Sequence, residues 1–306
     1  MKTTLPCILF FCCLLLSSAT QSSSATPSAS VAQFALEKSE KGYKILIDGR
    51  LFTEYITDQN GTPILWPLIG PGGQRMTRDY PMIADKPDEK KDHPHHRSLW
   101  FTHGDVNGVD FWAVGPGKGK IRHDRFALAR CDGDTATLQS ENSWVTPKDD
   151  ILCTDRRTVT FSEKDGARII EYQIELTAAV EECRFGDTKE GTFGVRVAGS
   201  MDVDAKNGGK IVNAQGEEDD AAWGKRSEWV EYSGPVDPGN GTIKIFDTPG
   251  GFRYPTYWHV RTYGLFAANP FGEHDFQNKP EKTGDYVLKK GETIRFKYII
   301  QMRNEK

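Results

Sequence analysis

Short segments in which apolar and polar residues alternate constrain the fold of this chain most strongly. From residue 43 onward such segments follow one another, and Asn-Gly pairs begin at Asn60, Asn107, Asn207 and Asn240. Alternation buries one face of a strand and exposes the other, and Asn-Gly favours the tight turns of β-hairpins. The clearest segments are 43–47, 121–128, 135–139, 158–161, 170–176 and 294–300. We therefore predict an all-β protein, a large antiparallel β-sandwich with few short helices, the best helix candidate being residues 217–226.

The N-terminus has the order of a secretory signal peptide: a basic start at Lys2, an apolar run over residues 5–16, and small residues at Ala19 and Ala25. As a helix the apolar run would be about 18 Å long, whereas a bilayer core is about 30 Å thick, so a membrane anchor is the weaker alternative. We predict a signal peptide over residues 1–25, a linker over 26–40 and one β-sandwich domain over 41–306. Two stacked sandwiches are the alternative. The mature protein is expected in the periplasm or outside the cell.

The charge of the chain indicates which ligands to expect. Lys and Arg number 39 against 43 Asp and Glu, so the formal net charge of -4 leaves no basic surface for nucleic acid. We expect a small-molecule or oligosaccharide ligand, no nucleic acid and no membrane span, and the oligomeric state stays open. Three cysteines follow the signal peptide, Cys131, Cys153 and Cys183, without CxxC spacing. Buried thiols are the favoured interpretation, and one disulfide of unknown pairing is the alternative.

Four of the seven histidines lie between positions 93 and 103. The spacing His93-x-His95 suits ligands of a divalent metal on a strand, so these two are candidate metal ligands. On an extended segment, His96 and His103 would point to opposite faces because their separation is odd. The alternative is that these histidines cap strand ends and bond to loop backbone. Their density beside Arg97 nevertheless favours a functional site.

A second dense segment covers residues 254–272. If it is extended, Tyr257, His259, Arg261 and Tyr263 share one face and Trp258 points to the other. Aromatic rings beside imidazole and guanidinium groups suit a sugar, since its C–H faces stack on rings while its hydroxyls take donors and acceptors. An edge-strand ladder of cross-strand pairs is the alternative.

A third segment, EGTFGVRV, begins at Glu190. Glu190 and Arg196 have the same parity on a strand, so an inward-facing Arg196 could take Glu190 as its carboxylate partner. The pair would be either purely structural or a base held ionised by a guanidinium.

Four long motifs carry a resemblance to a known family: TRDYP from Thr77, DHPHHRSLWFTHGDVNGVDFW from Asp92, EGTFGVRV from Glu190 and YWHVRTYGLFAANPFG from Tyr257. They resemble a secreted bacterial family of unknown function that carries the label "methane oxygenase PmoA". That label is a misassignment, because a particulate methane oxygenase subunit is a bundle of membrane-spanning helices. The resemblance runs from about Tyr43 to the C-terminus, and it implies an exported β-rich protein associated with sugar-degrading systems.

A looser likeness concerns the chemistry. The pair His103-Gly104, the distant His259 and Glu190 resemble the layout of aldose-epimerase-like sandwiches, which are galactose-mutarotase-like supersandwiches that bind sugars on a concave sheet. The resemblance implies the same general layout here, although the spacing differs.

The leading hypothesis is an exported carbohydrate-active enzyme that hydrolyses, eliminates or epimerises by proton transfer, because imidazole titrates near working pH. The candidate catalytic residues are His96, His103, Glu190 and His259. The candidate substrate-binding residues are Arg78, Arg97, Asn107, Trp112, Arg196, Tyr257, Trp258, Arg261, Tyr263 and Asn269. A metal-dependent oxidoreductase that uses His93 and His95, and a non-catalytic sugar-binding module, are the alternatives.

Overall fold

The computed structural model describes residues 1, 2 and 31–305, and the predicted signal peptide, apart from its first two residues, lies outside them. Residues 32–306 form one compact unit. Residues 34–38, expected within the linker, form strand β1 (Phe34–Lys38), which pairs with β2 (Gly42–Ile47). Among the described residues there is no helix with the length and hydrophobicity that a membrane span requires.

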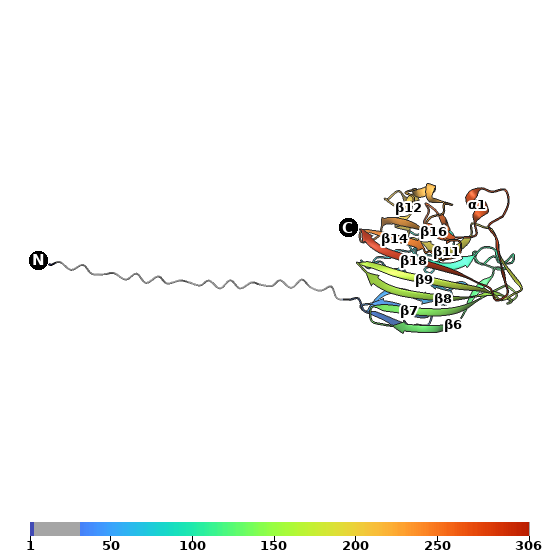
Figure 1. Cartoon of the computed structure of the whole chain (residues 1–306), viewed down its shortest axis with the longest axis horizontal. Helices are drawn as coiled ribbons and strands as arrows, with labels where there is room; N and C mark the ends of the chain where they lie inside the picture. Colours follow the sequence, from blue (N-terminus) through green and yellow to red (C-terminus); the bar gives the residue numbers. More distant parts are fainter. Residues whose placement is uncertain (3–30, 306) are drawn as a thin grey trace. The chain divides into compact units, whose positions relative to one another are not determined.

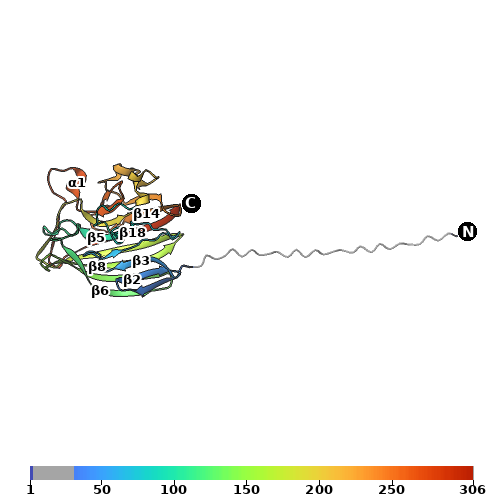
Figure 2. The ribbon, with the colours of Figure 1, turned by 180° about the vertical axis from the view of Figure 1, so that it is seen from behind.

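Antiparallel strands build a first sheet of eight strands. In spatial order these are β1, β2, β3 (Arg50–Ile56), β4 (Ile64–Leu65), β5 (Leu99–His103), β11 (Gly191–Arg196), β16 (Leu265–Asn269) and β15 (Tyr257–Val260). The last four strands come from three distant parts of the sequence. Strands β2, β3 and β5 of this sheet are labelled in Figure 2.

A second sheet of eight antiparallel strands faces the first. Its order is β12 (Lys210–Asn213), β13 (Trp229–Pro235), β14 (Asn240–Asp247), β18 (Thr293–Glu305), β9 (Ala167–Ala178), β8 (Ile151–Lys164), β7 (Thr135–Val145) and β6 (Lys120–Cys131). Figure 1 shows its long strands side by side. A separate pair is formed by β10 (Glu182–Phe185) and β17 (Tyr286–Lys289). The prediction of an all-β antiparallel sandwich is confirmed.

The core lies between the two sheets, and period-two alternation supplies it. In β9, for example, Ile170, Tyr172, Ile174 and Leu176 are all buried while the residues between them are less so. Rings from the two sheets meet directly: Phe193 of β11 stacks on Tyr298 of β18 with centroids 4.5 Å apart. Burying each such ring stabilises the fold by roughly 1.5–3 kcal/mol.

The outer face of the first sheet carries a second, smaller apolar cluster. Trp100 of β5 packs there with Trp112, Leu265 and Ala267, whereas its neighbours Leu99 and Phe101 point into the main core. The small residues Gly194 and Ala267 leave room for the Trp100 indole, since a Cβ on Gly194 would lie 2.7 Å from that ring. This face is therefore covered by side chains and loops.

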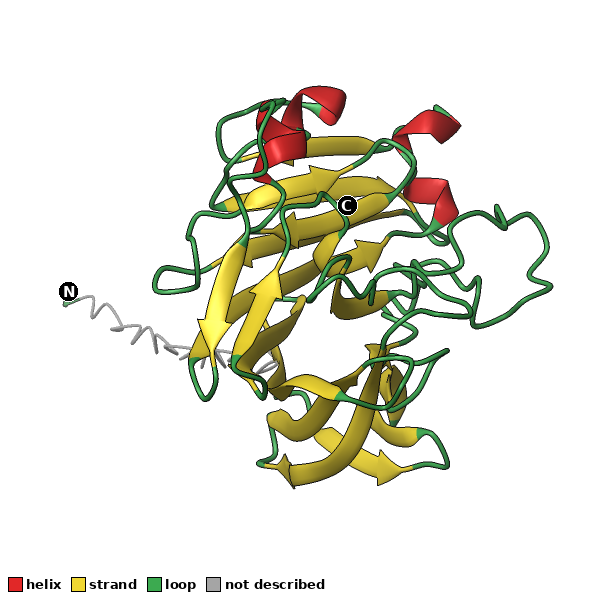
Figure 3. Cartoon of the chain, turned by 90° about the vertical axis from the view of Figure 1, so that its right-hand side faces the viewer, coloured by secondary structure: helices red, strands yellow, loops and turns green. Residues whose placement is uncertain are grey.

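Helical structure is scarce and short, as predicted. It comprises α1 (Glu273–Gln277) and the 3-10 turns η1 (Gly199–Met201), η2 (Val203–Ala205) and η3 (Asp219–Ala222). Figure 3 shows the helical turns, in red, in the upper part of the view. Only η3 falls in the segment 217–226 that was expected to be helical, so that expectation held for one short turn.

The Asn-Gly pairs have different outcomes. Asn107 and Gly108 form a two-residue turn with positive φ at both positions, closed by hydrogen bonds between Val106 and Val109. A hairpin does form at Asn240, between β13 and β14, but residues 236–239 make the turn and Asn240 is the first residue of β14.

The three cysteines in the described residues are all free thiols. Cys153 and Cys183 are fully buried, as expected for small apolar side chains, but Cys131 at the end of β6 is exposed.

Candidate functional site

Most of the predicted site residues gather on the outer face of the first sheet, over β5, β11, β16 and β15. They come from the loops before and after β5, from β11 and the two residues before it, from β15 and the turn after it, and from the residue that follows η3. We call this group the outer-face cluster. Its members are Arg78, Asp92, His93, His95, His96, Trp112, Lys189, Glu190, Arg196, Trp223, His259, Arg261 and Tyr263.

Parallel rings form one part of the cluster. The His93 ring stacks on Tyr263 at 5.0 Å and on His96 at 4.7 Å between centroids. His96 in turn stacks on Trp100 at 5.4 Å, and the His95 ring meets His96 edge-on at 4.5 Å. The histidine-rich loop is thus fixed against the sheet by ring contacts, so its imidazoles have defined positions.

Two buried arginines fix the histidine-rich loop by hydrogen bonds. Arg78 and Arg196 both donate to the carboxylate of Asp92, and Arg78 also donates to the backbone carbonyls of Lys90 and His93. Because the donors of Arg78 are taken up by the loop, this residue positions the histidines and is not open to a ligand. Arg196 also packs its guanidinium over the Tyr263 ring at 5.1 Å.

His259 lies on the outer face of β15 and is almost fully buried. Its Nδ1 is 2.8 Å from the carbonyl oxygen of Lys189. A carbonyl only accepts, so Nδ1 carries the proton and Nε2 keeps its lone pair. Burial lowers the pKa of His259 to about 4, against the opposing charge of Glu190, so the ring is neutral at pH 7.

Glu190 is the carboxylate at the centre of this arrangement. Its side chain is 37% exposed and pairs with Lys189 at 3.0 Å. Burial and the neighbouring His93 lower the pKa of His95 to about 4, and the Glu190 charge opposes that shift as it does for His259. The carboxylate therefore lies within electrostatic reach of two neutral imidazoles.

Arg261 and Tyr263 complete the cluster in the turn after β15. The Arg261 guanidinium lies over the rings of Trp223 and Tyr263 at 5.8 Å and 5.7 Å, and the Trp223 ring lies 6.4 Å from that of His259. All three side chains are partly exposed. Together they form an aromatic surface with a guanidinium at its centre, next to His259.

Two predicted residues lie in the interior instead. His103 is fully buried, with Nε2 2.8 Å from the Gly186 carbonyl and its ring against Phe271. Trp258 belongs to the main core and donates from Nε1 to the Ser227 carbonyl. His96 and His103 do lie on opposite sides of the sheet, as parity predicted, and for that reason only His96 reaches the cluster.

Other predicted ligand contacts are occupied by the protein itself. Arg97 is buried and donates to the carbonyls of Gln59 and His95, which fixes two loops together. Asn107 bonds to the backbone of β10, and Asn269 to the carbonyl of Thr188. Each assignment was wrong because these polar groups stabilise loops.

Two further predictions need correction. Tyr257 lies on the predicted face, but its ring is covered by Arg226 at 5.1 Å and by Phe276 at 5.5 Å. Glu190 and Arg196 do not pair with each other. Equal parity puts Glu190 and Arg196 on the same face of the sheet. A separation of six strand residues is about 20 Å, however, which is too far for an ion pair.

The arrangement of His93 and His95 does not favour the metal-dependent alternative. Their rings meet at 76° with centroids 5.6 Å apart. Among residues 1, 2 and 31–305, no group of three or more His, Cys, Asp or Glu side chains could hold a metal ion.

Sequence reasoning missed Asp92, Trp100 and Lys189 as contributors, and it placed Trp223 only at the border. Asp92 lies between Lys90-Lys91 and the basic segment 93–97. An acidic residue between two basic segments was therefore the available signal. Trp100 and Lys189 gave no signal, because their roles depend on strand neighbours distant in sequence.

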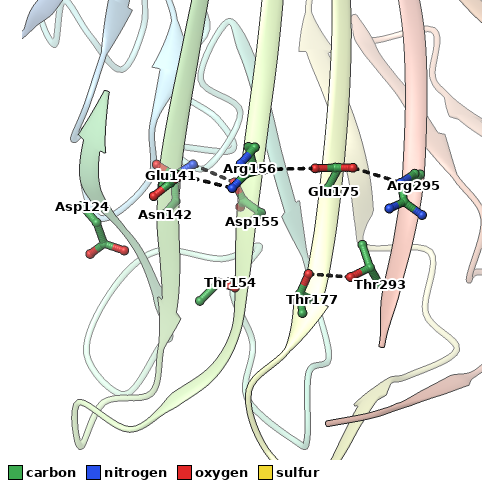
Figure 4. Close-up of a pocket in the computed structure, with 10 residues that line it drawn as sticks. All are labelled: Asp124, Glu141, Asn142, Thr154, Asp155, Arg156, Glu175, Thr177, Thr293 and Arg295. Atoms are coloured by element: carbon green, nitrogen blue, oxygen red, sulfur yellow. Dashed lines mark hydrogen bonds and ion pairs between the residues drawn. The ribbon is translucent and has the colours of Figure 1, made fainter. Parts of the chain in front are cut away.

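The second sheet also has a hollow on its outer face, of about 390 Å³. Figure 4 shows its charged side chains in a row across four strands: Glu141, Arg156, Glu175 and Arg295. Each of these charges is paired with a neighbour in the row, and the side chains are substantially exposed. Such a ladder stabilises a solvated sheet face and leaves no group free for chemistry.

Several solved structures are similar to this chain. An alpha-galactosidase from Lactobacillus brevis matches with 9% identity and a TM-score of 0.45, over 89% of this chain and 39% of that chain, so this chain spans about two fifths of it. A galactose mutarotase-like protein from Lactobacillus casei matches with 8% identity and a TM-score of 0.41, over 88% of this chain and 100% of that one. A GalM/aldose epimerase homologue from C. elegans matches with 11% identity and a TM-score of 0.30, over 90% and 100%. TM-scores this low carry no inference about substrate or catalysis.

Comparison with proteins of curated function gives no match. A family model matches residues 42–306, nearly the whole predicted domain, and it describes a family of unknown function, so the methane oxygenase label has no support. The chain belongs to this family of unknown function, DUF6807.

Proposed function

We propose that this protein is an exported carbohydrate-active enzyme that moves protons on a sugar bound to the outer-face cluster. One observation carries the proposal: a carboxylate, two neutral imidazoles and partly exposed aromatic rings lie together on one sheet face. Glu190, His95 and His259 supply the ionisable groups, and Trp223 and Tyr263 supply the rings. Export rests on the predicted signal peptide.

The aromatic part suits a sugar because the ring C–H groups of a pyranose pack on aromatic faces. Trp223 is partly exposed and supplies the apolar surface, whereas the Tyr263 ring is covered by His93 at 5.0 Å and by Arg196 at 5.1 Å. Arg261 lies over both rings as a donor for hydroxyl or anionic groups. A flat apolar surface with a few fixed polar groups is the usual composition of a small-molecule site.

The ionisable part suits acid–base chemistry. His259 keeps its Nε2 lone pair because Nδ1 is committed to the Lys189 carbonyl, so it can accept a proton. Glu190, exposed and beside Lys189, is the carboxylate base or the group that orients the substrate. Hydrolysis, elimination and epimerisation all require such proton transfers. His96 and His103 are not assigned these roles. His96 accepts a hydrogen bond from Arg196, and His103 lies in the core.

The test is turnover by the purified protein on a panel of glycosides and free sugars, followed by Glu190→Gln and His259→Gln. General acid–base groups contribute about 100-fold or more to rate, so each variant should lose at least that much in kcat/KM with an unchanged Tm. Glu175→Gln is the matched control, since that side chain is 39% exposed and lies on the second sheet.

Two results would contradict the proposal. If both variants keep the rate of the unmodified protein, the catalytic assignment is wrong. If sugars bind to the cluster and no member of the panel is turned over, the protein is a sugar-binding module, the remaining alternative from the sequence.

A further inference from the structure

Arg261 is a guanidinium that lacks an acceptor. Its Nε is buried without a hydrogen-bond partner, and no carboxylate or carbonyl in the described residues takes up its other donors. The other cations of the outer-face cluster differ in this respect: Arg78 and Arg196 donate to Asp92, and Lys189 pairs with Glu190. A donor left without an acceptor is unfavourable, so an acceptor supplied from outside would stabilise the guanidinium.

The backbone and the neighbouring rings fix the position of Arg261. Its N–H donates to the Leu265 carbonyl at 2.7 Å, and its own carbonyl accepts from Gly264 at 2.9 Å, which closes the turn after β15. The guanidinium lies over Trp223 and Tyr263 at 5.8 Å and 5.7 Å. A donor group held in this way loses little entropy when a ligand binds, because its position is already set.

The charge balance of the cluster limits what Arg261 can bind. Asp92 and Glu190 are already matched with cations, and at pH 7 the imidazoles of His95 and His259 are neutral. Arg261 is thus the cation of the cluster whose guanidinium lacks an acceptor. Its planar fork fits the oxygen pair of a planar carboxylate or of a sulfate ester.

We propose that Arg261 binds an oxyanion on the sugar, so that the substrates are acidic carbohydrates bearing a uronate carboxylate or a sulfate ester. This inference rests on the proposed function and specifies its substrate class. The sugar ring would lie against Trp223, with the anionic substituent at Arg261 and the reacting carbon toward Glu190 and His259.

The experiment measures binding of the purified protein to three matched sets of oligosaccharides: uronate-containing, sulfated and neutral. An array identifies the glycans bound, and titration calorimetry then measures their affinity. We expect charged glycans to bind at least about tenfold more tightly than their neutral counterparts, and the two charged sets show whether carboxylate or sulfate is preferred. Raising the salt concentration should weaken only the charged sets.

Substitution separates the role of Arg261 from that of its neighbours. Arg261→Gln should lower affinity for the charged set to the level of the neutral set, and Arg261→Lys, which keeps the charge but loses the fork, should fall between. Arg156→Gln on the second sheet is the control and should change nothing. The Tm of each variant shows whether it is folded. If Arg261→Gln does not fold, the affinity of Arg261→Lys for the charged glycans tests the inference instead.

Equal binding of charged and neutral glycans overturns the inference, and so does an unchanged preference in Arg261→Gln. In both cases sugars still bind, so the proposed function survives. If instead no glycan of any set binds and Glu190→Gln leaves every measured property unchanged, the proposed function itself fails.

Discussion

The guanidinium of Arg196 donates a hydrogen bond to Nδ1 of His96 over 3.0 Å, and both side chains are buried. An arginine can only donate, so Nδ1 is unprotonated and the proton of the neutral ring is on Nε2. Burial, together with His95 and Arg196, holds the pKa of His96 well below its usual value. His96 therefore carries its proton on Nε2 and does not act as a base at neutral pH.

This relationship predicts the NMR behaviour of His96. Its ring nitrogens should show the Nε2–H tautomer, without conversion to imidazolium near pH 6.5, where an ordinary imidazole titrates. Arg196→Met removes both the donor and a nearby positive charge, so the pKa of His96 should rise toward that of a free imidazole. A His96 ring that is protonated at pH 6 in the unmodified protein would contradict the assignment.

Burial of neutral histidine makes stability depend on pH. Burial lowers the pKa of His103 to about 4, from about 6.5 in the unfolded chain. Between these values the unfolded state binds more protons, so the free energy of unfolding falls as the pH falls from about 7 toward 4. At pH 5 this single residue should cost about 2 kcal/mol relative to pH 7.

Urea unfolding at pH 7.5 and pH 5 checks this expectation. In His103→Gln the difference between the two pH values should shrink by about 2 kcal/mol, even if the variant is less stable at both. An undiminished pH dependence in this variant would show that His103 does not carry the effect.

The predictable part of the structure is the part decided by local alternation. Residues 170–176 alternate because one face of β9 packs in the core, and Trp258 and His259 separate for the same reason. Parity likewise separated His96 from His103. Assembly of the cluster was not predictable, because β5, β11 and β16 become neighbours only through pairings such as Phe101 with Phe193. Parity fixes the face of a side chain but not its partner, which is why Arg196 was assigned to Glu190 when it pairs with Asp92.

A buried ion pair in the second sheet should matter far more than the exposed ladder on its outer face. Arg157 and Asp155 are both fully buried and bond through two hydrogen bonds of 2.8 Å and 2.9 Å, and Trp144 also donates to the carboxylate. Arg157→Met leaves that carboxylate buried without its cation, so the free energy of unfolding should fall by about 3–5 kcal/mol. Arg295→Met breaks an exposed pair with Glu175 and should cost no more than about 1 kcal/mol. Denaturant unfolding measures both, and similar losses in the two variants would contradict the expectation.

Gly104 should be required for the position of Glu190. Its N–H donates to the Glu190 carbonyl at 2.7 Å, and a Cβ added to it would lie 2.8 Å from Glu190 Cβ and 2.9 Å from that carbonyl oxygen. The backbone cannot yield as a flexible side chain would, so Gly104→Ala should push Glu190 outward and cost about 1–3 kcal/mol. Gly199→Ala is the control, since nothing lies within 4 Å of its added Cβ. The Tm, and kcat/KM on a substrate found with the glycoside and sugar panel, should both fall in Gly104→Ala and stay near the unmodified values in Gly199→Ala. Equal behaviour of the two variants would mean that the close approach of Gly104 does not position the carboxylate.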